Sequence, residues 1–204
     1  MRSFRYFVVL SATVMLCAWP AAASTDTVLI LHTNDLHDHL RPDYNGEGGL
    51  PYVSGYIQAE SAKRADALVL DGGDVMEKGD MLPFFTQSAA MYEAMSRVGY
   101  DAGAVGNHDW AYGIPQLRRC AELCGYPLLS VNLLEDGTPA GFAPSKLFDV
   151  DGVQVGVIGL TIPGRGGHSL DWPETAEAAN REVNRLEPEA HLIVALCHFG
   201  TGTC

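Results

Sequence analysis

Residues 28–39, with the sequence VLILHTNDLHDH, pass directly from an apolar run into a polar turn that contains Asp35 and His37. A short aliphatic run bounded by polar residues is typical of a buried strand. The same change from apolar run to polar cluster occurs three more times, at Gly73-Asp74, at Gly106-Asn107-His108-Asp109 and at His198. If the runs are strands of one sheet, all four clusters lie at its carboxyl edge, where open α/β sheets bind their ligands.

Apolar runs and segments of helical spacing alternate along the chain. The apolar runs lie at 27–32, 67–71, 102–105, 127–132, 145–150, 153–160 and 191–198. The helical segments lie at roughly 49–64, 83–98, 114–124 and 173–186. Asp151-Gly152 between two β-branched runs is the signal of a hairpin turn. The pattern predicts an α/β fold with a largely parallel, covered sheet and one antiparallel piece.

The segment 83–98 shows its helical spacing most clearly. One apolar stripe is formed by Met91, Ala94, Met95 and Val98 at i, i+3, i+4 and i+7. Such a stripe predicts a single helix with one buried face.

Length and charge limit the classes of partner. The 204 residues suit one domain and hold 25 acidic against 13 basic residues, a formal net charge of −12. A surface of this sign repels nucleic acid polymers and anionic membranes. It also repels a phosphate ester, unless bound cations reverse the potential at the site. An anionic substrate is therefore expected only together with bound metal.

The first residues have the features of a secretory signal. Two arginines within the first five residues precede an apolar run at 7–19 and then Ala21-Ala22-Ala23. The run is shorter than the roughly 20 residues that span a bilayer, and polar residues interrupt it. We predict a signal peptide at 1–23, a domain at 24–204, export to the periplasm or the extracellular space, and no stable membrane anchor.

Cleavage is expected at or within a residue or two of Ser24, because Ala21 and Ala23 supply the small side chains that signal peptidase requires. N-terminal sequencing of exported material checks this. A product that retains residues 7–19 would indicate an anchor instead.

Four cysteines remain after such a cleavage, at Cys120, Cys124, Cys197 and Cys204. Four cysteines allow three full pairings, and the sequence does not separate them. Cys120 and Cys124 share a helix face, and packing is favoured for them over a metal site. Cys197 lies inside the last apolar run and is expected to be buried.

The polar clusters combine carboxylate, imidazole and amide groups. Such a mixture suits Mn, Fe or Zn, whereas an all-oxygen cage would suit Mg or Ca. Two cations about 3.5–4 Å apart can lower the pKa of a shared water and hold the oxygens of a phosphate ester. Asp74, which follows two glycines, can stand between two ions, and Asp35 and His37 can face one of them.

The other ion can take the amide oxygen of Asn107 and the imidazole of His198. His108, the neighbour of Asn107, is better placed to face the substrate, where it can bind the developing charge or protonate the leaving alkoxide. Strand-end capping and turn chemistry would explain each cluster by itself, and His198 alone would pass for a core residue. Their coincidence at several strand ends favours a metal site.

The residues also show a family resemblance. Thr33-Asn34-Asp35-Leu36-His37, Asp71-Gly72-Gly73-Asp74, Gly106-Asn107-His108-Asp109 and the late His198 resemble the motifs of calcineurin-like metallophosphoesterases. Residues 31–37 with Gly48-Gly49-Leu50 narrow the resemblance to the exported 5′-nucleotidase group, which includes 2′,3′-cyclic phosphodiesterases and UDP-sugar hydrolases. Four motifs in order are far more specific than any one alone.

The resemblance implies a four-layer αββα sandwich with a site for two divalent metal ions, Mn, Zn or Fe. The two ions would be bridged by Asp74. The further ligands would be Asp35 and His37 on one ion and Asn107 and His198 on the other, with His108 as the catalytic residue.

Two departures from the family pattern stand out. The family commonly has an aspartate three positions after the catalytic histidine, and here that residue is Ala111. Asp109, a backbone carbonyl or no group at all would then hold His108. The family's Gly-His-x-His motif and its C-terminal nucleotide-binding domain are also absent from the 204 residues, so we expect a sandwich incomplete at its C-terminus and weak or no activity from this chain alone.

The leading hypothesis is a metal-dependent phosphoric ester hydrolase acting on nucleotides or similar small phosphate esters. One alternative is a thiosulfohydrolase of sulfur oxidation on the same scaffold, although the intact Gly106-Asn107-His108-Asp109 motif favours the phosphoesterase. The other alternative is a non-catalytic metal-binding fragment.

Overall fold

The structure is a computed structural model that describes residues 27–64 and 66–200. The predicted signal peptide, its cleavage site and Cys204 lie outside the described residues. Within those ranges, no helix combines the length and the apolar character needed to cross a bilayer.

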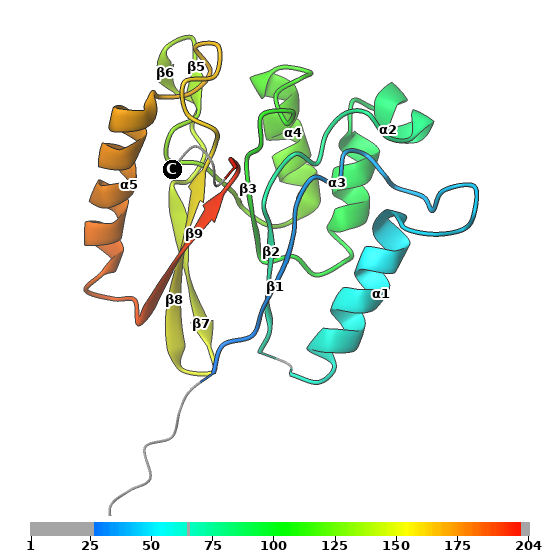
Figure 1. Ribbon diagram of the computed structural model, residues 1–204, viewed down its shortest axis with the longest axis horizontal. Coiled ribbons are helices and arrows are strands. Elements are labelled where there is room, and N and C mark those ends of the chain that lie inside the picture. Colours follow the sequence, from blue (N-terminus) through cyan, green and yellow to red (C-terminus); the bar gives the residue numbers. More distant parts are fainter. Residues whose placement is uncertain (1–26, 65, 201–204) are drawn as a thin grey trace, which may run out of the picture.

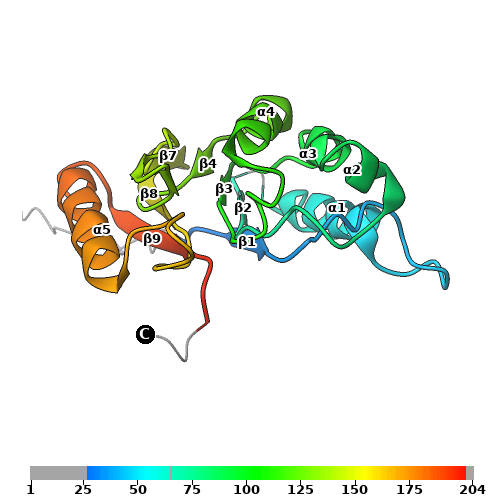
Figure 2. The same ribbon diagram turned by 90° about the horizontal axis from the view of Figure 1, so that it is seen from above.

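Two β-sheets form the centre of the molecule (Figures 1 and 2). The first sheet is parallel, with the order β1 (Ile30–Thr33), β2 (Leu68–Asp71), β3 (Ala102–Ala104) and β4 (Leu128–Leu129). The second has the order β7 (Ser145–Val150), β8 (Val153–Leu160) and β9 (Leu192–Cys197), with β7 antiparallel and β9 parallel to β8. The Asp151-Gly152 hairpin is confirmed between β7 and β8.

Helices cover the outer face of each sheet. Those beside the first sheet are α1 (Gly49–Ser61), α2 (Met81–Phe85), α3 (Ala89–Met95) and α4 (Ile114–Cys124), and α5 (Trp172–Leu186) covers the second. Figure 2 shows the resulting order of layers, helix, sheet, sheet and helices. The predicted α/β fold with its αββα layering is therefore confirmed.

Side chains of the central strands alternate between the layers, as a period of two requires. In β2, Leu68 and Leu70 belong to the core between the two sheets, whereas Val69 packs under the helices. In β8, Val155 and Val157 face the first sheet, and Ile158 belongs to the core beneath α5. Strands buried on both faces explain why these runs are continuously apolar.

Two expected elements differ from the prediction. The segment 83–98 forms α2 and α3 rather than one helix, because Gln87 and Ser88 take φ values of 50° and 64° between them. Ser88 is fully buried and donates its hydroxyl hydrogen bond to Asp38 Oδ2 at 2.7 Å. Of the run 127–132, only Leu128–Leu129 is a strand, and the chain then crosses toward the second sheet.

A second hairpin went unnoticed in the sequence. β5 (Leu134–Glu135) pairs antiparallel with β6 (Thr138–Pro139) across the turn Asp136-Gly137. The Asp-Gly signal that revealed the hairpin of β7 and β8 was available here too.

The cysteines give one agreement and one correction. Cys120 and Cys124 are buried thiols on α4 that pack in the core beneath the helices, as favoured. Cys197 is exposed instead of buried, because it ends β9 at the edge of its sheet.

Gly159 brings β8 of the second sheet close to β4 of the first and provides a test of the sandwich. A Cβ at this position would lie 2.2 Å from the carbonyl oxygen of Leu129 in β4. Gly159→Ala is expected to lower the free energy of unfolding by about 1–3 kcal/mol, the usual cost of overpacking, because the obstacle is backbone. Urea unfolding followed by fluorescence measures the change.

Gly55 provides the matched control. It lies in α1 with nothing within 4 Å of an added Cβ, so Gly55→Ala is expected to stabilise the protein by roughly 0.5–1 kcal/mol. Equal stability of the wild type and Gly159→Ala would contradict the packing described for the two sheets.

Candidate metal centre

Asp74 lies at the centre of the candidate site, in the loop after β2. Its side chain is buried, with a residue exposure of 4%. Its Oδ1 accepts the backbone N–H of His108 at 2.7 Å, which leaves Oδ2 for the site. Gly106 makes this approach possible, because a Cβ there would lie 2.2 Å from Asp74 Oδ1. A hydrogen bond from the backbone of the motif at 106–109 to the side chain of Asp74 thus joins that motif to the one at 71–74.

Three imidazoles surround the free oxygen of Asp74. The Nε2 atoms of His198, His37 and His108 lie 3.2, 3.9 and 4.0 Å from Asp74 Oδ2. The opposite nitrogens of two of them face backbone carbonyls: Nδ1 of His37 lies 3.2 Å from the oxygen of Met76, and Nδ1 of His198 lies 2.9 Å from that of Gly72. A hydrogen bond from Nδ1–H to a carbonyl leaves Nε2 as a ligand atom, the arrangement usual for histidines that bind metals.

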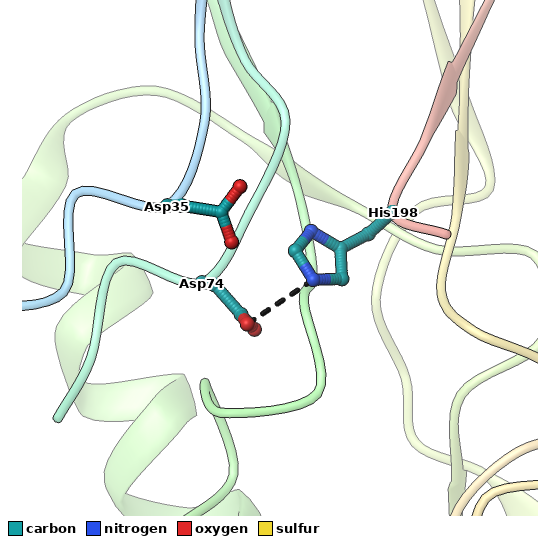
Figure 3. A group of neighbouring side chains, drawn as sticks. All are labelled: Asp35, Asp74 and His198. Atoms are coloured by element: carbon teal, nitrogen blue, oxygen red, sulfur yellow. Dashed lines mark ion pairs between the residues drawn. The ribbon is translucent and has the colours of Figure 1, made fainter. Parts of the chain in front are cut away.

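Asp35 completes the group from the end of β1. Its carboxylate, that of Asp74 and the imidazole of His198 each place one ligand atom within 4.8 Å of the others (Figure 3). The loop is held in place because Asp35 N–H donates to the carbonyl of Gly73 at 2.9 Å and His37 N–H to that of Asp74 at 3.0 Å. The pairing of β1 with β2 therefore continues past the strand ends.

One cavity of about 760 Å³ is lined by Asn107 together with the three residues just described. Asp35, Asp74, Asn107 and His198 all line it. Carboxylate, imidazole and amide groups on one concave surface match the donors that Mn, Fe and Zn take in proteins. The residues present therefore fit a divalent transition metal ion.

Electrostatics couple Asp74 to His198. Burial alone would raise the pKa of Asp74, but the hydrogen bonds from His198 and from the N–H of His108 more than offset it and lower the pKa. Burial likewise opposes the charge on His198, yet the Asp74 carboxylate and the Gly72 carbonyl raise the pKa of His198 to about 9. In the metal-free protein at neutral pH, a proton thus holds the position that a cation would take.

This coupling predicts that metal binding depends on pH. A cation that binds Nε2 of His198 must displace its proton, so the apparent affinity rises as pH approaches 9 and falls by up to about tenfold per unit below it. Calorimetric titration with Mn²⁺ in buffers of different ionisation enthalpy is expected to show about one proton released per ion near pH 7. His198→Ala should abolish that release.

His168→Ala is the matched control, because His168 is exposed and its ring lies against Trp110 rather than at the site. Affinity that does not change from about pH 6.5 to 8.5, together with no proton release, would exclude His198 as a ligand.

Asp109 is a buried carboxylate that organises the site without facing it. It is 1% exposed, and its oxygens accept backbone N–H groups of Asp74, Val75, Met76 and Gly106 at 2.7–3.1 Å. Burial and the neighbouring charge of Asp74 raise its pKa to about 6 in spite of these donors. The carboxylate fixes the loop after β2 to the loop after β3.

The structure thus gathers the sequence-predicted set at one edge of the first sheet. Asp35, His37, His108 and His198 surround the carboxylate of Asp74, and Asn107 lines the cavity at this site.

Two neighbours of His108 were missed in the sequence. Nδ1 of its imidazole lies 2.5 Å from Glu77 Oε2, and Nε2 lies 2.9 Å from Lys78 Nζ. Neither residue belongs to a motif, although their position three and four residues after Asp74 places them on the same loop. None of the three alternatives expected for holding His108 describes this contact, which is made by Glu77 and not by Asp109.

Comparisons with known proteins agree with this geometry. Residues 28–202 match the family described as calcineurin-like phosphoesterase. The protein UshA of Yersinia enterocolitica is 36% identical over 197 residues, which are 90% of this chain and 36% of that protein. The crystal structure of a 5′-nucleotidase precursor from Thermus thermophilus superposes with a TM-score of 0.73 at 31% identity, covering 86% of this chain and 38% of that one.

The sulfate thiohydrolase SoxB of Thermus thermophilus superposes with a TM-score of 0.71 at 20% identity, over 88% of this chain and 45% of that one, and so shares the fold. The chain spans about a third of the length of the curated relatives that it matches.

Proposed function

Because the chain belongs to the calcineurin-like phosphoesterase family, we propose that it carries the metal-binding part of a hydrolase that cleaves nucleotides or similar small phosphate esters. The observation that carries the proposal is that the Nε2 atoms of three histidines lie within 4.0 Å of Asp74 Oδ2. The relatives named as 5′-nucleotidases support nucleotides as the substrate class.

In this proposal Asp74 would be a ligand shared by two divalent ions, Asp35 and His37 would help to hold one of them, and Asn107 and His198 would help to hold the other. Such ions, when bound, supply Lewis acidity and lower the pKa of water. They also reverse the local potential of an otherwise acidic protein, so that an anionic ester can approach.

His108 has a different task from the ligand histidines. Its Nδ1 faces a carboxylate, whereas those of His37 and His198 face carbonyls. Its Nε2 is nevertheless on the site side, 4.0 Å from Asp74 Oδ2. We assign it to the substrate: once Nε2 has also taken up a proton, it donates a hydrogen bond to the phosphoryl oxygens or passes that proton to the leaving alkoxide.

Export is part of the proposal and rests on the signal pattern of residues 1–23. The thiosulfohydrolase alternative is less well supported, since its structural neighbour shares the fold alone at 20% identity.

The test uses the full-length gene product, stripped of metal and reloaded with Mn²⁺ or Zn²⁺. Release of phosphate from 5′-AMP is expected with metal and is expected to disappear with chelator. A thiosulfonate is the comparison substrate. Turnover of the thiosulfonate without turnover of 5′-AMP would support the thiosulfohydrolase instead. Metal binding without turnover of either substrate would support the hypothesis of a non-catalytic metal-binding fragment.

A further inference from the structure

We propose that Glu77 is the positioning residue for His108, in place of the aspartate that the family resemblance expects at Ala111. This inference deepens the proposed function and rests on it. The motifs do not include Glu77, which comes from the loop that follows β2 rather than from the segment that carries His108.

The contacts of His108 define one arrangement of protons. Glu77 Oε2 lies 2.5 Å from Nδ1 and can only accept, whereas the ammonium of Lys78 lies 2.9 Å from Nε2 and can only donate. Both contacts are satisfied when Nδ1 carries the proton and Nε2 carries the lone pair. The carboxylate thereby fixes both the tautomer and the rotation of the ring, with Nε2 toward the site.

Other carboxylates near His108 are already engaged. Asp109, the adjacent residue, accepts four backbone N–H groups and lies near the hydroxyl of Tyr92 at 3.3 Å. Ala111 offers only a methyl group, and its N–H donates to the carbonyl of His108. The hydrogen-bonding carboxylate at Nδ1 of His108 is therefore that of Glu77.

The backbone of the loop is strained where it presents these side chains. Glu77 and Lys78 have φ values of 73° and 79°, a left-handed region that non-glycine residues enter only at an energetic cost. The buried carboxylate of Asp38 holds them there, since its Oδ2 accepts the N–H of Glu77 at 2.7 Å. Strain of this kind persists where surrounding contacts enforce it, and it is typical of functional sites.

Stability alone does not account for the pair. The side chain of Glu77 is 41% exposed and that of His108 is 25% exposed. A carboxylate–imidazole contact as open as this contributes little to folding stability, less than the strain of the two loop residues costs. The arrangement is better explained by the orientation of His108 than by folding.

The experiment compares Glu77→Gln and Glu77→Ala with wild type in the metal-loaded full-length gene product. We expect kcat on 5′-AMP to fall about 10- to 100-fold, as for other groups that orient a catalytic side chain, with KM and Mn²⁺ affinity within about twofold. Glu60→Gln is the matched control, since it breaks the ion pair between Glu60 in α1 and Lys63 just after that helix, and it should leave kcat unchanged.

A second change tests the substitution of one carboxylate for another. Adding Ala111→Asp to Glu77→Ala is expected to restore part of the lost kcat, because the new aspartate occupies the family's position. A double variant no more active than Glu77→Ala would refute the statement that Glu77 replaces that aspartate.

A readout independent of activity separates this inference from the proposed function. Long-range ¹H–¹⁵N spectra of the metal-free protein report which nitrogen of His108 carries the proton, with His108→Gln used for assignment. We expect Nδ1–H in wild type and loss of that preference in Glu77→Ala. An unchanged tautomer, unchanged kcat, or a parallel loss of metal affinity would overturn the positioning role. No turnover even by wild type would overturn the hydrolase proposal, while the spectra would still decide the role of Glu77.

Discussion

Replacing Asp74 by asparagine is expected to lower both Mn²⁺ affinity and metal-dependent hydrolysis by at least about 100-fold. Loss of a residue that merely supports a ligand already costs about 10- to 100-fold, and Asp74 is proposed to contact both ions. The amide keeps the shape and can still accept the N–H of His108, so the loop should remain folded. Calorimetric titration and phosphate release measure the two effects.

Asp136→Asn is the matched control for this change. Asp136 has a φ of 51°, close to the 58° of Asp74, and lies in the turn of the β5–β6 hairpin away from the site. Circular dichroism should show the same fold for both variants. Wild-type affinity in Asp74→Asn would exclude Asp74 as the bridging ligand.

The second large effect is expected from His108→Gln. General acid–base catalysis contributes about 100- to 10,000-fold, and glutamine removes the titratable nitrogen while keeping a polar side chain. We therefore expect kcat to fall within that range and metal affinity to stay unchanged, because His108 is assigned to the substrate. The backbone N–H that it donates to Asp74 is retained in the variant.

His39→Gln is the control, since His39 is exposed and lies in the loop after β1 without a ligand role. Equal losses of kcat and of metal affinity in His108→Gln would instead make His108 a metal ligand.

The sequence pattern predicted the α/β fold because its central strands are short and buried on both faces, whereas the four-layer sandwich was implied by the family resemblance. Leu68–Asp71 is apolar up to the aspartate where the sheet ends, so both the strand and its exit are visible in four letters. The clusters that follow such exits meet at one edge, which is a consequence of parallel strands. Local pattern was therefore sufficient to place Asp35, His37 and Asp74 at one edge of the sheet, whereas His198 by itself would have passed for a core residue.

The partner of His108 could not be found in the same way. Glu77 reaches it from 31 residues away along the chain, through a loop whose backbone takes an unfavourable conformation. That conformation depends on the buried carboxylate of Asp38, a long-range contact that no spacing rule contains. The break between α2 and α3 has the same origin, because Ser88 also binds Asp38.

The contact between His198 and the carbonyl of Gly72 joins positions 126 residues apart in the chain. Contacts of such separation form late in folding, since a long loop must close before they contribute. Asp35 and Asp74 can meet as soon as β1 and β2 pair, but the imidazole of His198 arrives only when β9 has docked beside β8. Binding of a metal ion by all three residues is therefore expected only after the second sheet has formed. During synthesis, Asp35 and Asp74 leave the ribosome before His198, so the two carboxylates are present without the histidine until β9 has paired with β8.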